Sequence, residues 1–154
     1  MVELRAAGAT VGLGTDSVAS NNSLSMLREM HVAGLVQKNQ RWDASVLTAQ
    51  ELLDLATRDG ARLLGRGADL GSLEPGKRAD FSLFRLDHPT MLPARPEAIV
   101  SHLAYSAAEE AIDSVYVEGL PVVQHRALTR ADWTTIRRDG EAAAEALWSS
   151  RPKA

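Results

Sequence analysis

The stretch Thr10–Ser17 constrains the fold of this chain more than any other part of the sequence. A short run of β-branched and apolar residues ends in glycines, and the carboxylate of Asp16 follows at once. Asn21 and Asn22 come next, before an apolar run at helical spacing. This order is typical of the carboxyl end of a parallel strand that leads into a helix, where barrel enzymes place catalytic residues. A strand–Asp–helix junction is also an ordinary helix cap, so the residues alone leave both interpretations open.

The composition narrows the function classes. The 154 residues carry a formal net charge of −3 and contain no basic cluster, which gives no support for nucleic acid or an anionic membrane as a partner. The chain has no cysteine, and this excludes disulfides, thiolate metal sites and a cysteine nucleophile. It also has no apolar run of about 18 residues and no signal-peptide pattern, so we expect no membrane partner and a cytoplasmic location.

The first 69 residues predict helices around a single strand. Val2–Gly8 is typical of the end of a helix, and Thr10–Leu13 of a short strand. The spacing of apolar residues predicts a helix over Leu24–Lys38. Thr48 and Glu51 have the spacing of a capping box, which predicts the start of another helix. These elements amount to one step of an alternating α/β fold, without the strand that should precede the first helix.

The pattern changes at residue 70. Pro75 and Gly76 suit the two central positions of a type II turn. Ala79–Leu86 and Ile112–Glu118 alternate like half-buried strands, and Gly119 then turns the chain into a further short strand. We expect a small β module over residues 70–128.

The last segment predicts an amphipathic helix. Asp132 stands where the helix opens, and residues 151–154 are expected to fray. We expect the apolar stripe of this helix to face a core or a barrel wall. The stripe consists of Trp133, Ile136, Gly140, Ala143 and Leu147.

Three motifs together resemble a known family. They are Gly12–Asp16 with Ser20–Asn22, then Leu47–Gly65, and then Gly71–Asp80. In combination they are similar to the C-terminal part of the metal-dependent amidohydrolases. Within that superfamily they resemble the branch of the methylthioadenosine/S-adenosylhomocysteine deaminases and the atrazine-type chlorohydrolases. The segment Val115–Val123 resembles the closing β-hairpin of this family, and the resemblance extends from about residue 2 to residue 147.

The resemblance implies a fold. It implies an α/β fragment in which residues 1–69 are the last strand and helices of a (β/α)8 barrel. Residues 70–128 would be the C-terminal part of a small β-sandwich that both chain ends build together. Residues 129–154 would be a C-terminal helix and tail.

The resemblance also implies a site. Such enzymes hold a divalent metal, zinc or iron, with a His-x-His pair, two later histidines and an aspartate at the end of strand eight. Asp16 matches that aspartate, which borders the metal and takes a proton from the metal-bound water. The residue type suits this chemistry, because a metal lowers the pKa of water and a nearby carboxylate can accept the proton. Asn21 and Asn22 are expected to shape the following loop, with contact to the substrate as a further expectation.

The other members of the implied site are missing from the sequence. There is no His-x-His, and all four histidines (His31, His88, His102 and His125) follow Asp16, where the family places no ligands. A barrel of this kind also needs about 250 residues. We therefore expect the C-terminal portion of a larger enzyme, whose partner is a missing N-terminal barrel segment or subunit. The complete enzyme would hydrolyse C–N or C–Cl bonds on purine, pyrimidine or triazine-like rings, and this chain alone would bind no metal.

Several other interpretations stay beside this one. The chain could be a non-catalytic module with an amidohydrolase-derived fold that binds a partner, and it could form a homo-oligomer. Gly12 and Gly14 lack the third glycine and the βαβ unit of a dinucleotide site, and Ser17 has no His–Asp pair to activate it. His31 lies among apolar helix positions and is interpreted as a packing residue. Surfaces meant for a barrel would leave the isolated chain marginally stable, self-associating or dependent on a partner.

Overall fold

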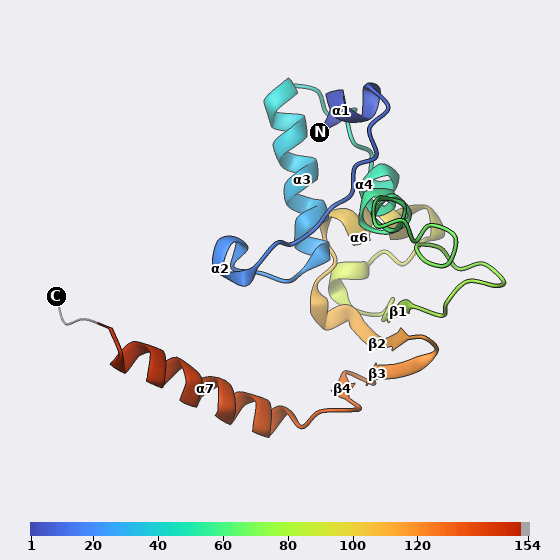
Figure 1. Cartoon of the computed structure of the whole chain (residues 1–154). Helices are drawn as coiled ribbons and strands as arrows, with labels where there is room; N and C mark the ends of the chain where they lie inside the picture. The colour runs from blue at the N-terminus through green and yellow to red at the C-terminus, as the bar shows by residue number, and fades with distance from the viewer. Residues whose placement is uncertain (152–154) are drawn as a thin grey trace.

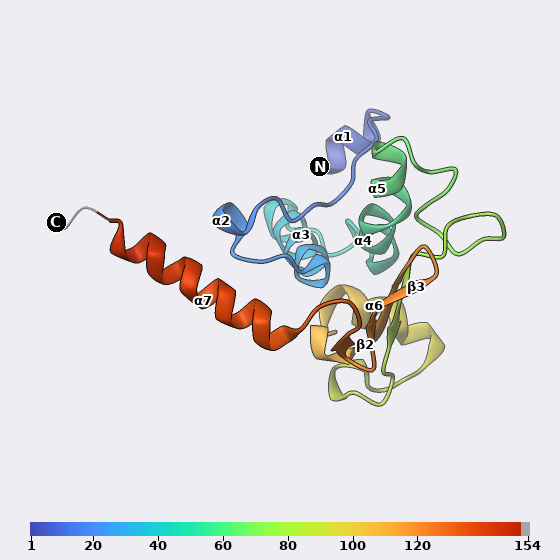
Figure 2. The same ribbon diagram turned by 60° about the horizontal axis from the view of Figure 1, so that its bottom comes forward.

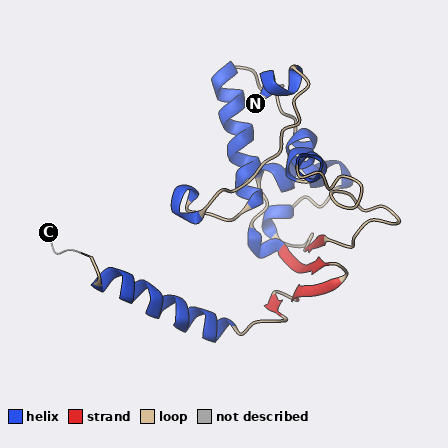
Figure 3. Ribbon diagram, in the orientation of Figure 1, coloured by secondary structure: helices blue, strands red, loops and turns tan. Residues whose placement is uncertain are grey.

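The computed structural model describes residues 1–151 and places a cluster of helices beside a small sheet (Figure 1). Figure 3 distinguishes the helices, in blue, from the strands, in red. In chain order the elements are α1 (Val2–Ala6), α2 (Val18–Asn21), α3 (Met26–Arg41), α4 (Ala49–Ala56), α5 (Arg58–Leu63), β1 (Phe81–Phe84), the 3-10 helix η1 (Pro89–Met91), α6 (Pro96–Tyr105), the 3-10 helix η2 (Glu109–Ala111), β2 (Ile112–Val117), β3 (Leu120–Gln124), β4 (Ala127–Leu128) and α7 (Trp133–Ser149). Within the described residues, none of these helices combines the length and the apolar character that crossing a membrane requires.

The core lies where α3, α4 and α6 meet. Leu52 and Leu55 of α4 are fully buried there. Gly34 lets the helices approach closely, because a Cβ atom at this position would lie 2.9 Å from Leu52 Cδ1 and 3.2 Å from the Tyr105 ring. The buried members of this cluster are Met30, Leu47, Leu52, Leu55 and Ala104.

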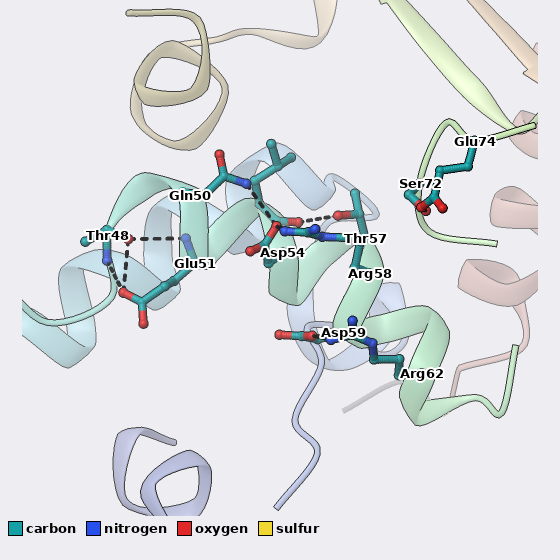
Figure 4. A network of polar contacts seen from close by, with 11 residues as sticks. Thr48, Gln50, Glu51, Asp54, Thr57, Arg58, Asp59, Arg62, Ser72 and Glu74 are labelled. Atoms are coloured by element: carbon teal, nitrogen blue, oxygen red, sulfur yellow. Dashed lines mark hydrogen bonds and ion pairs between the residues drawn. The ribbon is translucent and has the colours of Figure 1, made fainter. Parts of the chain in front are cut away.

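Local signals in the sequence correctly predicted the start of one helix and the position of one turn. The Thr48 hydroxyl accepts from the Glu51 N–H, and the Glu51 carboxylate accepts from the Thr48 N–H at 2.8 Å, so the capping box is confirmed. Figure 4 shows this box at the start of α4, followed by carboxylate contacts along α4 and α5. At the Pro75–Gly76 turn, the Lys77 N–H donates to the Glu74 carbonyl and Gly76 has a φ of +91°.

The segment Thr10–Leu13 differs from the prediction, because it forms no strand here. Strands form by pairing, and no neighbouring strand lies beside this segment within residues 1–151. Among the described residues, its one backbone hydrogen bond to another element joins the Leu13 N–H to the Leu55 carbonyl, at 3.0 Å. The segment therefore runs between α1 and α2 with most of its backbone hydrogen-bonding groups unpaired.

Two helices also differ from the sequence analysis. The predicted helix over Leu24–Lys38 is α3, which begins at Met26 and ends at Arg41, with Ser25 as its N-cap. Helix α6 was not predicted, and it lies within the segment interpreted as a β module. His102 lies within α6 and is half-buried. The division into residues 1–69, 70–128 and 129–154 stays a prediction.

The sheet is antiparallel, with the strand order β1-β2-β3-β4. Its register places five apolar side chains on one face, because Val115 pairs with Val123, Val117 with Leu120, and Val123 with Leu128. Three of them are solvent-exposed to between 43 and 51 %. This face, called the apolar sheet face below, consists of Val115, Val117, Leu120, Val123 and Leu128. One sheet with an uncovered apolar face is what half of a β-sandwich would present.

The predicted C-terminal helix is confirmed as α7, but its apolar stripe is not buried as expected. Asp132 caps it, accepting from the N–H groups of Thr134 and Thr135. The helix points away from the sheet in both views (Figures 1 and 2), and none of its residues is buried. The two ends of the stripe, Trp133 and Leu147, are both about two-thirds exposed.

Candidate active site

Asp16 lies between the segment Thr10–Leu13, whose backbone is mostly unpaired, and α2, which begins at Val18. Its side chain is exposed, and its backbone has a φ of +55°, in the left-handed region that non-glycine residues seldom adopt. The Ser20 hydroxyl, one helical turn further on, donates to Asp16 Oδ2 at 2.9 Å. The same hydroxyl lies 3.0 Å from the Ser17 carbonyl. The carboxylate is therefore oriented by the loop and faces solvent.

Asn21 lies at the end of α2 and faces inward. Its Nδ2 atom donates to the Thr15 carbonyl at 2.8 Å and to Glu29 Oε1 at 2.6 Å. The amide therefore ties the residue just before Asp16 to the first turn of α3. Asn22, by contrast, is exposed and ends α2 in the left-handed conformation, with a φ of +59°.

Residues 1–151 do not complete a metal site. Among them no three His, Asp or Glu side chains lie close enough together to hold one ion. Zinc sites take three or four protein ligands, so the one carboxylate of Asp16 does not make such a site by itself.

The four histidines have other neighbours. The His31 ring meets the edge of the Tyr105 ring, with their centroids 6.1 Å apart. His88 Nδ1 lies 2.9 Å from the Thr90 hydroxyl, and His125 Nδ1 lies 3.4 Å from Asp113 Oδ2. The fourth, His102, contacts the carbonyl of Pro93. These contacts are of the kind that structural histidines make.

Sequence reasoning missed Glu29. Its carboxylate holds Asn21, yet in the sequence it is one acidic residue in the first turn of a helix, where acidic residues are common. In the sequence Glu29 follows Asn21 by eight residues. That spacing crosses a loop and has no fixed geometry, so the contact could not be predicted.

Comparison with known proteins identifies the family of this chain. Residues 2–122 match the amidohydrolase family, and the chain belongs to that family. The predicted resemblance is thereby confirmed, and so is the fold class, a part of the barrel-containing amidohydrolase fold.

Particular relatives are deaminases and triazine hydrolases. The 5-methylthioadenosine/S-adenosylhomocysteine deaminase of Desulforudis audaxviator is 43% identical over 150 residues, which are 97% of this chain and 34% of that protein. The S-triazine hydrolase of Gordonia rubripertincta is 35% identical over 82% of this chain and 26% of its own length. The chain therefore spans about a third of the length of the curated relatives it matches.

Two solved structures also match nearly all of this chain and about a third of their own length. An adenosine deaminase from Xanthomonas campestris with bound zinc superposes with a TM-score of 0.89 and 32% identity, over 95% of this chain and 33% of that one. The zinc complex of atrazine chlorohydrolase from Arthrobacter aurescens TC1 superposes with a TM-score of 0.80 and 34% identity, over 91% of this chain and 31% of that one.

Proposed function

We propose that this chain works as the C-terminal portion of a hydrolase that cleaves C–N or C–Cl bonds on purine, pyrimidine or triazine-like rings. The observation that carries the proposal is the exposed carboxylate of Asp16, held by a structured loop at the junction between an unpaired segment and a helix. Deaminases and triazine hydrolases among the relatives support the class of bond. The other two-thirds of the enzyme would be the partner of this chain.

In this proposal Asp16 is the general base. Its carboxylate accepts a proton from the water that attacks the ring carbon, and the Ser20 hydroxyl orients the carboxylate for that transfer. A divalent metal, zinc or iron, would lower the pKa of the water in the complete enzyme, with most of its ligands outside this chain. Zinc in the solved relatives supports this cofactor. Asn22 and the Oδ1 atom of Asn21 would contact the heterocyclic substrate.

The test combines this chain with the rest of a relative. The part of the Desulforudis audaxviator deaminase outside the matched 150 residues is co-expressed with this chain, and the complex is loaded with zinc. Release of ammonia from methylthioadenosine and S-adenosylhomocysteine is measured beside release of chloride from atrazine. We expect turnover by the complex with at least one of these rings.

Asp16→Asn is the matched variant, since it keeps an oxygen that accepts from Ser20 but removes the base. Loss of a general base typically lowers the rate by about 10²–10⁴-fold. We expect kcat to fall by that order while the free energy of unfolding stays within about 0.5 kcal/mol of the parent, as for most surface substitutions. Turnover within twofold of the parent would refute the role of Asp16.

A second candidate function rests on the apolar sheet face. A contiguous exposed apolar face marks an interaction surface, so we propose as the alternative a non-catalytic module that binds a partner chain. A chain that is a cooperative monomer, inactive and indifferent to the rest of the relative would favour this alternative over the enzyme portion. A cytoplasmic location and a homo-oligomeric state stay predictions.

A further inference from the structure

The backbone at Asp16 adopts a conformation that its own side chain does not favour. A φ of +55° brings the Cβ atom close to the backbone, and aspartate is one of the few residues besides glycine that reach this conformation, where local hydrogen bonds support it. The Asp16 side chain is exposed, so packing around it does not supply the constraint. The constraint must come from the residues on either side.

The peptide plane that precedes Asp16 is held through the Thr15 carbonyl. The angle φ of Asp16 is the rotation between the Thr15–Asp16 peptide plane and the rest of Asp16, so fixing this plane fixes one side of the rotation. The plane is fixed by the hydrogen bond from Asn21 Nδ2 to the Thr15 carbonyl, at 2.8 Å. The other side is fixed by α2, where the Ser20 hydroxyl contacts both the Ser17 carbonyl and the Asp16 carboxylate.

Glu29 anchors the Asn21 amide to the core. Its Oε1 atom accepts the second hydrogen bond of Nδ2, at 2.6 Å, and a carboxylate acceptor makes this bond stronger than a neutral one. Glu29 lies in the first turn of α3, directly before Met30, which is 3 % exposed and part of the core. A continuous line of contacts thus runs from the core through Glu29 and Asn21 to the peptide plane of Asp16.

Both hydrogens of the Asn21 amide are used inside the protein, because an amide NH2 group has two. We propose that Asn21 and Glu29 are positioning residues, which hold Asp16 in its left-handed conformation and so aim its carboxylate at the reacting water. The catalytic purpose of this positioning rests on the proposed function. The effect on the backbone conformation of Asp16 does not depend on that function and can be measured in this chain alone. Asn21 acts through Thr15 and touches no reacting atom.

The test is the backbone conformation of Asp16 in the purified full chain, measured by NMR. Carbon-13 chemical shifts and residual dipolar couplings report φ at Asp16 in the parent chain and in Asn21→Ala, Glu29→Ala and Glu29→Gln. We expect the left-handed signature in the parent and its loss in both alanine variants. Glu29→Gln should retain it, because the glutamine Oε1 can still accept from Asn21.

Two controls separate a positioning role from general damage. Asn39→Ala removes an exposed asparagine of the same helix, α3, and should leave the Asp16 signature unchanged. The methyl resonances of Leu52 and Leu55 report the core and should not shift in any variant. A left-handed signature that persists in both alanine variants, or that is missing from the parent chain, would overturn the proposal. Enzyme activity does not enter this measurement, so its outcome is independent of the Asp16→Asn assay.

Discussion

At the scale of single residues, a short stretch of chain joins an exposed carboxylate to the buried core. Asp16 is exposed and held in a left-handed conformation, while Met30, fourteen residues later, is buried. The Asn21 amide links the two environments. Conformational strain of this kind costs on the order of 1–3 kcal/mol per residue and is common at functional sites. Six other non-glycine residues of the described chain also have a positive φ, so the conformation of Asp16 gains its interest from the hydrogen bonds that hold it.

Two glycines inside helices, Gly34 and Gly140, test how closely the helices around them are packed. A Cβ atom on Gly34 would meet Leu52 and Tyr105 in the closed core, whereas on Gly140 of α7 it would meet nothing within 4 Å. We expect Gly34→Ala to lower the free energy of unfolding by about 1–2 kcal/mol, since overpacking outweighs the gain in helix propensity. Gly140→Ala should instead increase the helicity of α7, by about 1 kcal/mol of propensity. Urea unfolding and circular dichroism measure both, and equal effects at the two sites would contradict the packing described here.

At the scale of elements, sequence signals that act within a few residues predicted the structure well. The capping box at Thr48 and the turn at Pro75–Gly76 depend on neighbours three residues away, and both are present. The segment Thr10–Leu13 failed as a strand because pairing needs another strand beside it. Helix α6 was missed because its place depends on tertiary packing, through Ala104, onto α3 and α4. Asp16 could be picked out from its position after the glycines, but the contact between Asn21 and Glu29 depends on the fold.

The capping box of α4 predicts a dependence on pH. The Thr48 N–H, which donates to the Glu51 carboxylate, is the main cause that holds the pKa of Glu51 below its ordinary value of 4.5, and Arg5 adds to it. A lowered pKa in the folded state means that the ionised form stabilises the fold. This contribution is fully present above pH 4.5 and is lost as the pH falls through the lowered pKa.

We therefore expect Glu51→Ala to cost about 1 kcal/mol at neutral pH, a typical value for a helix cap on a partly exposed group. The cost should shrink as the pH is lowered below 4.5, and denaturant unfolding at a series of pH values measures it. Glu51→Gln serves as the control, because it keeps an oxygen for the Thr48 N–H but cannot ionise. A cost of Glu51→Ala that stays the same at low pH would show that the charge of Glu51 contributes nothing.

At the scale of the whole molecule, the chain leaves several surfaces uncovered. They are the unpaired backbone of Thr10–Leu13, the apolar sheet face and the stripe of α7. Exposed apolar area costs about 25 cal/mol per Å², so a few hundred Å² amounts to several kcal/mol. That is comparable to the stability of a small domain. The structure of a relative that is three times as long superposes on nearly all of this chain, which is consistent with these surfaces being covered by more polypeptide.

The apolar sheet face supplies a test of this view. Val117→Lys and Leu120→Lys place charges on exposed positions of that face, while Leu83→Lys places one on the opposite face of the sheet, at similar exposure. We expect the first two to weaken binding to the rest of a relative by at least tenfold and Leu83→Lys to weaken it less. Analytical ultracentrifugation measures this binding. If Leu83→Lys weakens it as much as the other two, the apolar sheet face has no special part.

The central claim is that Asp16 belongs to an active centre that this chain does not complete by itself. The most direct measurement is the zinc content and the hydrolytic turnover of the purified chain, determined alone and after mixing with the remaining part of the Desulforudis audaxviator deaminase. We predict no stoichiometric zinc and no turnover for the chain alone, and both in the mixture. Stoichiometric zinc with turnover by the chain alone would contradict the claim.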